Sequence, residues 1–282
     1  MERKGIGVVI LNYRGETILL PCVESVLAEL GPDDGCLIID HGQEKELMRR
    51  VKERFPSVSI IEPEKNEGFA RGMNRGLAQI FSQPYAAAWL LNNDTVVLPG
   101  ALKELKAAQQ RFPGTHLFSP VILNQAQAVW FAGGEIHWWR MRTKHRRVLQ
   151  SESQPFETRF LTGCALLVPY TTYRTLGGFD ERYFLYYEDA EYSVRTTQQG
   201  GRLLVIPRSR VIHEEVSNLN PDKLYWLVRS GVEFFSRHTP SWQRWWFRSF
   251  LTIRRLYNWM RCFFSADPLA RAVKRAYTDA SI

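Results

Sequence analysis

The sequence is poor in cysteine and contains no long apolar run. Its cysteines are Cys22, Cys36, Cys164 and Cys262. They lie far apart and form no C-x-x-C pair, which argues against a zinc cluster and a disulfide framework. No stretch reaches the roughly 18 apolar residues of a membrane-spanning helix, and the apolar run before Asn12 is too short for a signal peptide. We therefore expect a protein of the reducing cytoplasm.

Two common nucleotide-binding signatures are also missing. The sequence has no G-x-x-x-x-G-K-[ST] motif, and GIGVVI at 5–10 precedes its expected strand and lacks the final glycine of a dinucleotide fingerprint. There is no internal repeat or low-complexity tract. At 282 residues and 45% hydrophobic content, the chain is long enough for one large core with an appendage.

Apolar runs alternate with amphipathic stretches along the first hundred residues. Strands are expected at 7–12, 36–40, 58–62 and 87–92, with helices at 17–30, 44–55 and 71–82. Further on, we expect a helix from Pro99 to about Arg111 and strands at 116–123, 163–170 and 202–207, whereas 124–160 is irregular. This alternation predicts βαβ crossovers and a mainly parallel sheet flanked by helices.

Polar residues follow several of these strands, where an open α/β sheet gathers its ligands. Asn12, Asp40 and the triplet Asn92-Asn93-Asp94 occupy such positions. Strand-ending loops are often polar for structural reasons, but the set as a whole favours a common site. In NEGFARGMNRG at 66–76, close helix packing would explain the glycines. A bound phosphate would also explain Asn66, Arg71 and Asn74.

The run YFLYYEDAEYSVR at 183–195 places four aromatic residues just before Glu188 and Asp189. Acidic residues are common in the first turn of a helix, which is one explanation. The other is a catalytic carboxylate beside an aromatic wall that binds a sugar, excludes water and raises the pKa of the carboxylate.

Taken together, VVILNY, LIID, NEGFARGMNRGL, WLLNNDT, FLTGCALLV, LGGFDERYFLYYEDAEYSVR and VIH resemble, in order and spacing, the family 2 inverting glycosyltransferases. The similarity covers about residues 5–217, is most specific over 177–195, and is greatest to a rhamnosyltransferase-like bacterial branch. It implies a GT-A fold with a nucleotide-sugar half (1–98), an acceptor half (99–217) and a basic helical region (218–282).

The resemblance also implies roles for individual residues. It places nucleotide contacts at Asn12, Asp40, Asn66, Gly68, Phe69, Arg71, Asn74 and Asn92. It places Mg²⁺ or Mn²⁺ at Asp94, with His213 as a second metal ligand or a contact to the diphosphate, and the catalytic base at Asp189 with Glu188 beside it. It places acceptor contacts at Gly163, Phe179, Asp180 and Glu181. His213 has a plainer alternative as a hydrogen-bonded histidine, and Asp180 and Glu181 have one as turn residues.

Two departures from the family pattern affect these assignments. Asn92 replaces the first acid of the metal motif, so a single carboxylate is available there. HGQEK follows Asp40 where the family commonly has Asn and a Ser- or Asp-bearing turn, so contacts to the nucleotide base are open.

The implied reaction transfers a sugar from dTDP-L-rhamnose or a UDP-hexose to a glycan or lipid-linked glycan of the bacterial envelope, such as lipopolysaccharide, O-antigen or capsule. We expect the enzyme to be cytoplasmic and peripheral at the inner face of the membrane. The alternatives are a sugar-nucleotide pyrophosphorylase, whose nucleotide loop NYRGET matches poorly, and a non-catalytic nucleotide-sugar, membrane or nucleic-acid binding protein, which the lost acid favours.

The excess positive charge lies in the C-terminal region. Of the net charge of +8, residues 223–275 contribute eleven Lys and Arg against two acids, and they hold five of the nine tryptophans. A helix over 242–264 would carry on one face Trp242, Trp246, Phe250, Ile253, Tyr257, Met260 and Phe264, opposite Arg244, Arg248 and Arg255. This pattern favours an anionic membrane surface, with packing on the catalytic domain or a second copy as the alternative; nucleic acid is unlikely, since phosphate requires no apolar face.

Overall fold

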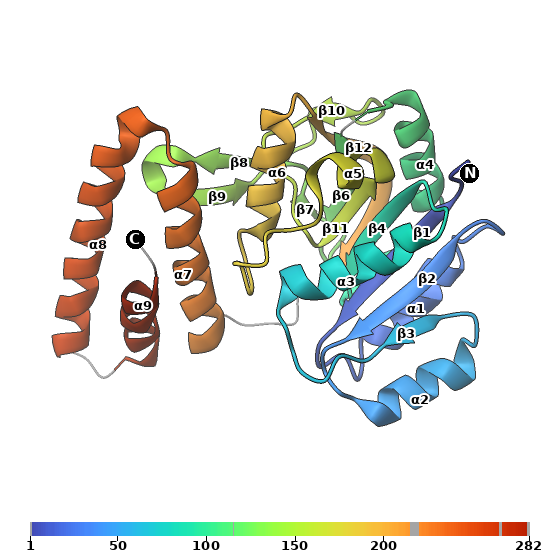
Figure 1. Ribbon diagram of the computed structural model, residues 1–282, viewed down its shortest axis with the longest axis horizontal. Coiled ribbons are helices and arrows are strands. Elements are labelled where there is room, and N and C mark those ends of the chain that lie inside the picture. The colour runs from blue at the N-terminus through green and yellow to red at the C-terminus, as the bar shows by residue number, and fades with distance from the viewer. Residues whose placement is uncertain (1, 115, 215–219, 265–266, 281–282) are drawn as a thin grey trace.

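The computed structural model describes residues 2–114, 116–214, 220–264 and 267–280. They form a central β-sheet covered by helices, with three further helices standing together on one side (Figure 1). In the first half, the elements are β1 (Ile6–Asn12), α1 (Leu19–Leu27), β2 (Gly35–Asp40), α2 (Lys45–Arg54), β3 (Ser59–Ile61), α3 (Phe69–Ser82), β4 (Ala87–Asn92), β5 (Thr95–Val97), α4 (Ala101–Arg111) and β6 (His116–Leu123).

The second half begins with short strands and ends in long helices. Its elements are β7 (Val129–Phe131), β8 (Gly134–His137), η1 (Trp138–Arg140), β9 (Arg142–His145), β10 (Phe156–Glu157), β11 (Ala165–Pro169), α5 (Tyr170–Leu176), α6 (Glu188–Gln198), β12 (Arg202–His213), α7 (Pro221–His238), η2 (Ser241–Gln243), α8 (Arg244–Phe264) and α9 (Pro268–Asp279).

The main sheet has the order β10-β12-β6-β11-β4-β1-β2-β3. It is parallel from β3 to β4 and between β12 and β6, whereas β11 runs antiparallel between β4 and β6. β1, β2 and β4 are almost fully buried because helices cover both faces, which explains their continuous apolar composition. The predicted parallel α/β sheet is therefore confirmed.

The register of the sheet aligns the polar strand ends. Asn12 of β1 pairs with Asp40 of β2, and Leu11 pairs with Asn92 of β4. The carboxyl ends of the three strands therefore share one edge of the sheet, as the sequence predicted.

The irregular stretch 124–160 forms a small addition beside the main sheet. β7 pairs with β6, and β8 and β9 form a separate antiparallel hairpin. This addition brings the side chain of Trp130 against His213 and the side chain of His145 against Phe160.

The C-terminal helices α7, α8 and α9 pack against one another, and α8 lies farthest from the sheet (Figure 1). The boundary expected between 217 and 218 falls outside the described residues. Within the part of the chain that is described, no helix is both long enough and apolar enough to cross a membrane.

Candidate active site

A cavity of about 620 Å³ opens at the edge where β1, β2 and β4 end. Its wall includes nine of the residues to which the family resemblance assigns a role: Asn66, Gly68, Phe69, Asn92, Asp94, Gly163, Glu188, Asp189 and His213. The helix α7 closes one side with Asp222, Lys223, Trp226 and Leu227. Segments from both halves of the chain thus meet at one cavity large enough for a small-molecule ligand.

Asn12 and Asp40 lie beneath this wall instead of in it. Both are fully buried, and Asn12 Nδ2 donates hydrogen bonds to Asp40 Oδ1 (2.8 Å) and Glu44 Oε2 (3.0 Å). Asp40 also accepts from the backbone N–H groups of Gly42 and Glu44. Because these polar atoms already have partners, the two residues fix the turn under the cavity, and their expected contacts with the nucleotide stay predictions.

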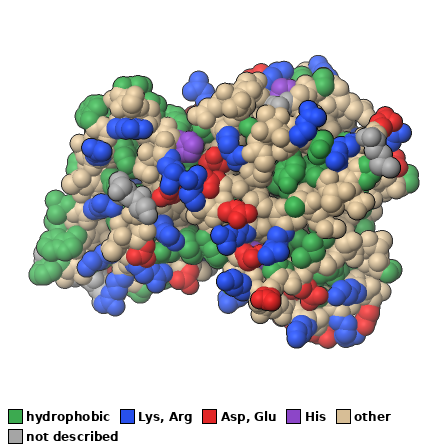
Figure 2. Space-filling view, in the orientation of Figure 1, with side chains coloured by type: hydrophobic (Ala, Val, Ile, Leu, Met, Phe, Trp, Pro, Cys, Tyr) green, Lys and Arg blue, Asp and Glu red, His purple; other side chains and the backbone are tan. Residues whose placement is uncertain are grey.

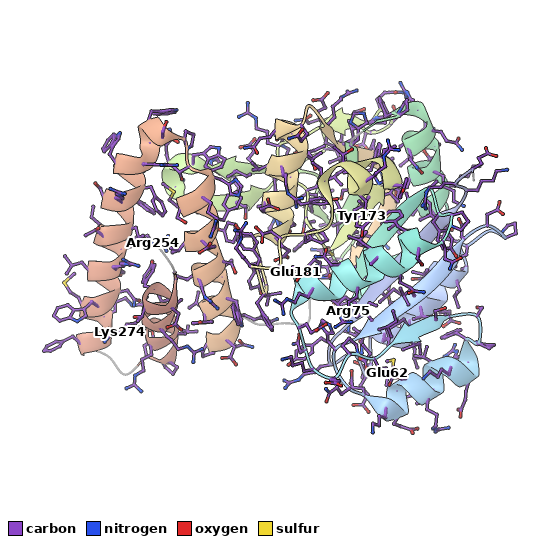
Figure 3. The ribbon with its side chains drawn as sticks, in the orientation of Figure 1. Glu62, Arg75, Tyr173, Glu181, Arg254 and Lys274 are labelled. Carbon is purple, nitrogen blue, oxygen red and sulfur yellow. The ribbon has the colours of Figure 1, made fainter. Side chains whose placement is uncertain are left out.

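Arg71, Asn74 and the segment 179–181 also lie outside the cavity wall. The side chain of Asn74 donates to the Phe179 carbonyl (2.9 Å) and accepts from the Phe179 N–H (2.8 Å). Arg71 Nε is 3.2 Å from Glu181 Oε2, and Figure 3 shows Glu181 near the beginning of α3. Asp180 pairs with Arg182. These contacts hold the GGFDER loop on α3, and the proposed acceptor contacts of this loop stay predictions.

Gly68 shows why the NEGF turn requires glycine. It precedes α3 with φ of 86°, and a Cβ there would lie 2.4 Å from the Phe184 carbonyl oxygen. The next N–H, that of Phe69, donates to the same oxygen at 2.7 Å. The beginning of α3 is therefore hydrogen-bonded to the segment that leads to Glu188.

Asp94 and His213 form a polar pair in the cavity wall. β5 pairs antiparallel with β12, and Asp94 Oδ2 lies 3.1 Å from His213 Nε2. Asp94 Oδ1 is buried without a hydrogen-bond partner among the described residues. A carboxylate oxygen left open beside an imidazole fits a divalent cation. No third His, Cys, Asp or Glu within the described ranges completes a cation site.

The protonation of His213 depends on this pair. Burial lowers its pKa, but the neighbouring Cys164 and Asp94 outweigh burial and raise the pKa to about 11. Without a cation, the imidazolium therefore pairs with Asp94. A cation that binds His213 must displace a proton, because a metal-bound imidazole is neutral.

Glu188 and Asp189 begin α6. Asp189 Oδ2 accepts from the Gly163 N–H (2.9 Å) and Oδ1 from the Ala190 N–H (2.8 Å). Burial raises the pKa of Asp189 to about 6, and the backbone N–H groups limit the rise. Burial and the charge of Asp189 raise the pKa of Glu188 well above its ordinary value. Asp189 is thus ionised at neutral pH and still basic enough to accept a proton.

The two residues before this carboxylate pair have an unusual backbone. Tyr186 and Tyr187 both have φ of 68°, in the left-handed region that non-glycine residues rarely adopt. Such conformations cost about 1–3 kcal/mol each and persist where the surroundings hold them, commonly at active sites. The loop that delivers Glu188 and Asp189 is therefore held by its neighbours.

The family model described as "Glycosyltransferase like family 2" matches residues 3–228. The chain belongs to this family. It is a glycosyltransferase, which decides against the pyrophosphorylase and the non-catalytic alternatives. The N-acetylglucosaminyl-diphospho-decaprenol L-rhamnosyltransferases of two Mycobacterium tuberculosis strains are each 26% identical over 248 residues, which is 77% of this chain and 81% of theirs.

Solved glycosyltransferases share the fold. GalNAc-T7 with UDP, GalNAc and Mn²⁺ superposes with a TM-score of 0.66 at 19% identity. The match covers 81% of this chain and 47% of GalNAc-T7, so this chain spans about half the length of that protein. The mannosyltransferase PcManGT from Pyrobaculum calidifontis, with GDP-Man and Mn²⁺, has a TM-score of 0.59 at 12% identity and covers 100% of this chain and 77% of its own. These likenesses confirm the GT-A fold.

Several residues of the glycosyltransferase's cavity wall were not predicted from the sequence. His41 is buried, its Nε2 has no hydrogen-bond partner among the described residues, and it lines the cavity next to Asn66. Trp130 and His145 come from the irregular stretch, and Trp226 comes from α7. The unusual HGQEK sequence marked the position of His41, whereas no local pattern marked the other three.

If Asp189 is the catalytic base, as the resemblance implies, its raised pKa predicts how transfer depends on pH. Because the base must be ionised, we expect kcat to fall as the pH drops through about 6. An ordinary aspartate would keep its activity to about pH 4. The measurement is kcat at saturating donor and acceptor from about pH 4.5 to 8, with donor binding followed in parallel. Full activity at the acidic end would contradict the assignment of Asp189.

Proposed function

We propose that the protein is an inverting glycosyltransferase that moves one sugar from a nucleotide diphosphate, dTDP-L-rhamnose or a UDP-hexose, to a lipid-linked glycan of the bacterial envelope. The observation that carries this proposal is a single cavity lined by both a half-buried carboxylate with a pKa of about 6, Asp189, and an incompletely bonded pair, Asp94 and His213. The names of the 26% identical relatives support the donor and acceptor class.

The mechanism follows from these groups. When bound, Mg²⁺ or Mn²⁺ would be held by Asp94 and His213 and would neutralise charge on the leaving diphosphate. Asp189 takes the proton from the acceptor hydroxyl as the hydroxyl attacks the anomeric carbon from the face opposite the leaving group. Burial and the charge of Asp189 disfavour the ionised form of Glu188, so we assign the role of the single base to Asp189. One base and one displacement give inversion, in contrast to the two carboxylates of glycosidases.

The donor class can be tested by thermal unfolding with dTDP, UDP, GDP and ADP, each with and without Mn²⁺. A ligand at 100 times its Kd stabilises the folded state by about 2.7 kcal/mol. We expect one diphosphate to raise the Tm and Mn²⁺ to increase the effect. A protein that unfolds cooperatively and responds to none of the four would contradict a nucleotide-sugar donor.

We also propose that α8 binds an anionic membrane surface, where a lipid-linked acceptor would lie. The buried side of α8 carries Phe247, Leu251 and Asn258. Its outward side carries exposed apolar residues: Trp245, Ile253, Leu256, Tyr257, Met260 and Phe263. Figure 2 shows hydrophobic side chains along the outer edge of the molecule in the place of α8. Exposed arginines flank them at 244, 248 and 255. Of the expected apolar stripe, Trp242, Ile253, Tyr257 and Met260 are exposed, whereas Trp246 and Phe250 are half-buried; the side chain of Phe264 lies outside the described residues.

The membrane proposal predicts vesicle binding that depends on this face. The wild-type protein should float with phosphatidylglycerol-containing vesicles, less so at high salt because salt screens the arginines. Ile253→Glu combined with Met260→Glu should abolish flotation. Val148→Glu, which changes an exposed apolar residue in the region of the hairpin, is the matched control. Unchanged flotation of the double variant, or a stable dimer that the double variant dissociates, would contradict the proposal.

A further inference from the structure

We infer that α7 completes the active site by holding the loop 183–187, and that Ser230 and Gly231 are positioning residues for Asp189. This inference rests on the proposed role of Asp189 as the base. Both positioning residues lie beyond residue 228, where the family match ends. The C-terminal region would thus take part in catalysis as well as in binding a surface.

The first contact is a hydrogen bond between α7 and the loop. Ser230 Oγ donates to the Leu185 carbonyl oxygen at 2.8 Å, and Ser230 is 4% exposed. That carbonyl precedes Tyr186, the first of the two left-handed residues. The bond therefore fixes the loop at the point where its backbone turns towards Glu188.

The second contact is made by the ring of Tyr187. A Cβ on Gly231 would lie 3.0 Å from Tyr187 Cε2, so the absence of a side chain lets the ring rest on α7. The same ring packs against Phe234 and Phe235, with centroid distances of 5.4 and 5.8 Å. Tyr187 is the residue just before α6, so the position of its ring determines where Glu188 and Asp189 begin.

The beginning of the loop is held from two sides. The Phe184 ring stacks on Trp226 of α7 at 4.4 Å with an interplanar angle of 23°. The Phe184 carbonyl accepts the hydrogen bond from the Phe69 N–H at the start of α3. The loop is thus held between α3 and α7. Since neither tyrosine favours a left-handed backbone, release of α7 would let the loop relax and move Asp189.

Ser230→Ala tests this inference directly, with Ser236→Ala as its matched control on the same helix. The hydroxyl of Ser236 donates within α7 to the Glu233 carbonyl and not to the loop. We expect Ser230→Ala to lower kcat about ten- to a hundredfold with the KM of the donor changed less than twofold, because a misplaced base slows the chemical step more than it weakens binding. Ser236→Ala should leave both constants unchanged.

Two further measurements separate positioning from a general loss of stability. In an Asp189→Asn background, Ser230→Ala should lower the residual kcat less than twofold, because Ser230 acts through Asp189. Gly231→Ala, which displaces the Tyr187 ring, should repeat the loss of kcat seen in Ser230→Ala. Equal losses in Ser230→Ala and Ser236→Ala, or a raised donor KM with unchanged kcat, would overturn the inference.

Amide hydrogen exchange tests the same contact without any transferase assay. We expect residues 184–190 to exchange faster in Ser230→Ala than in the wild type or in Ser236→Ala, since a local opening becomes easier. Unchanged protection of this loop would overturn the inference whatever the activity. If the wild-type protein showed no transferase activity and Ser230→Ala still increased exchange in the loop, only the proposed function would be contradicted.

Discussion

Asp189→Asn is expected to lower the kcat of sugar transfer by about 10² to 10⁴, the usual contribution of a general base. The asparagine oxygen can still accept the N–H of Gly163, and only the bond from the Ala190 N–H to the second oxygen is lost, so the loop and the cavity should persist. The amide cannot take the proton of an acceptor hydroxyl. Stabilisation by the nucleotide diphosphate should therefore be the same as in the wild type, and steady-state kinetics should show the loss in kcat.

Glu188→Gln is the matched control for this substitution. Its carboxyl is buried beside Asp189, and burial and the charge of Asp189 raise its pKa well above the ordinary value, which disfavours its ionised form. We expect the Gln variant to retain kcat within about tenfold, a loss well below that of a missing base. A larger loss in Glu188→Gln than in Asp189→Asn would exchange the roles of the two residues.

Asp94→Asn is expected to lower kcat/KM at least about 10²-fold and to remove its dependence on Mn²⁺. A bound cation contributes several kcal/mol of charge stabilisation to such a reaction, and about 2.7 kcal/mol corresponds to 10²-fold. Because Asn92 replaces the first acid of the metal motif, Asp94 supplies the one carboxylate of the triplet 92–94. The loss should therefore not be compensated by its neighbours.

Asp222→Asn is the control for a change of charge at the same cavity. Asp222 belongs to α7, and its side chain is 88% exposed and pairs loosely with Arg275. We expect this variant to keep its response to Mn²⁺. If Asp94→Asn kept full Mn²⁺-dependent stabilisation by nucleotide, the cation would bind elsewhere and the pairing of Asp94 with His213 would be only structural.

The strands and helices around the site could be predicted because their signals are local. Continuous apolar runs marked β1, β2 and β4, and the polar residues after them marked the edge at which the cavity opens. The ordered motifs then indicated which carboxylates line it. One cavity receives Asp94 and His213 because β5 pairs with β12, and it receives Asp189 because α6 begins beside Gly163. The sequence indicated these long-range contacts only through the family resemblance.

Other parts of the site depend on partners that are distant in the sequence. Asn12 and Asp40 end their strands as predicted, but their mutual hydrogen bond could not be read from the sequence, and their contacts with a nucleotide stay predictions. Trp130 reaches His213 only after β7 joins β6. Ser230 meets Leu185 because the C-terminal helices fold back on the loop. Patterns in a single sequence report the local propensity of a residue and not which distant residues it will contact in the fold, so these contacts could not be predicted.

The central claim is that one base, Asp189, acts on an acceptor opposite a diphosphate leaving group, and the stereochemistry of the product tests it most directly. The enzyme is incubated with Mn²⁺, the sugar nucleotide whose diphosphate gives the largest thermal shift, and a diphosphate-linked N-acetylglucosamine lipid analogue. NMR then gives the anomeric configuration of the new linkage. We predict a single transferred sugar with inverted configuration, formed by the wild type and not by Asp189→Asn; a retained configuration would contradict the account.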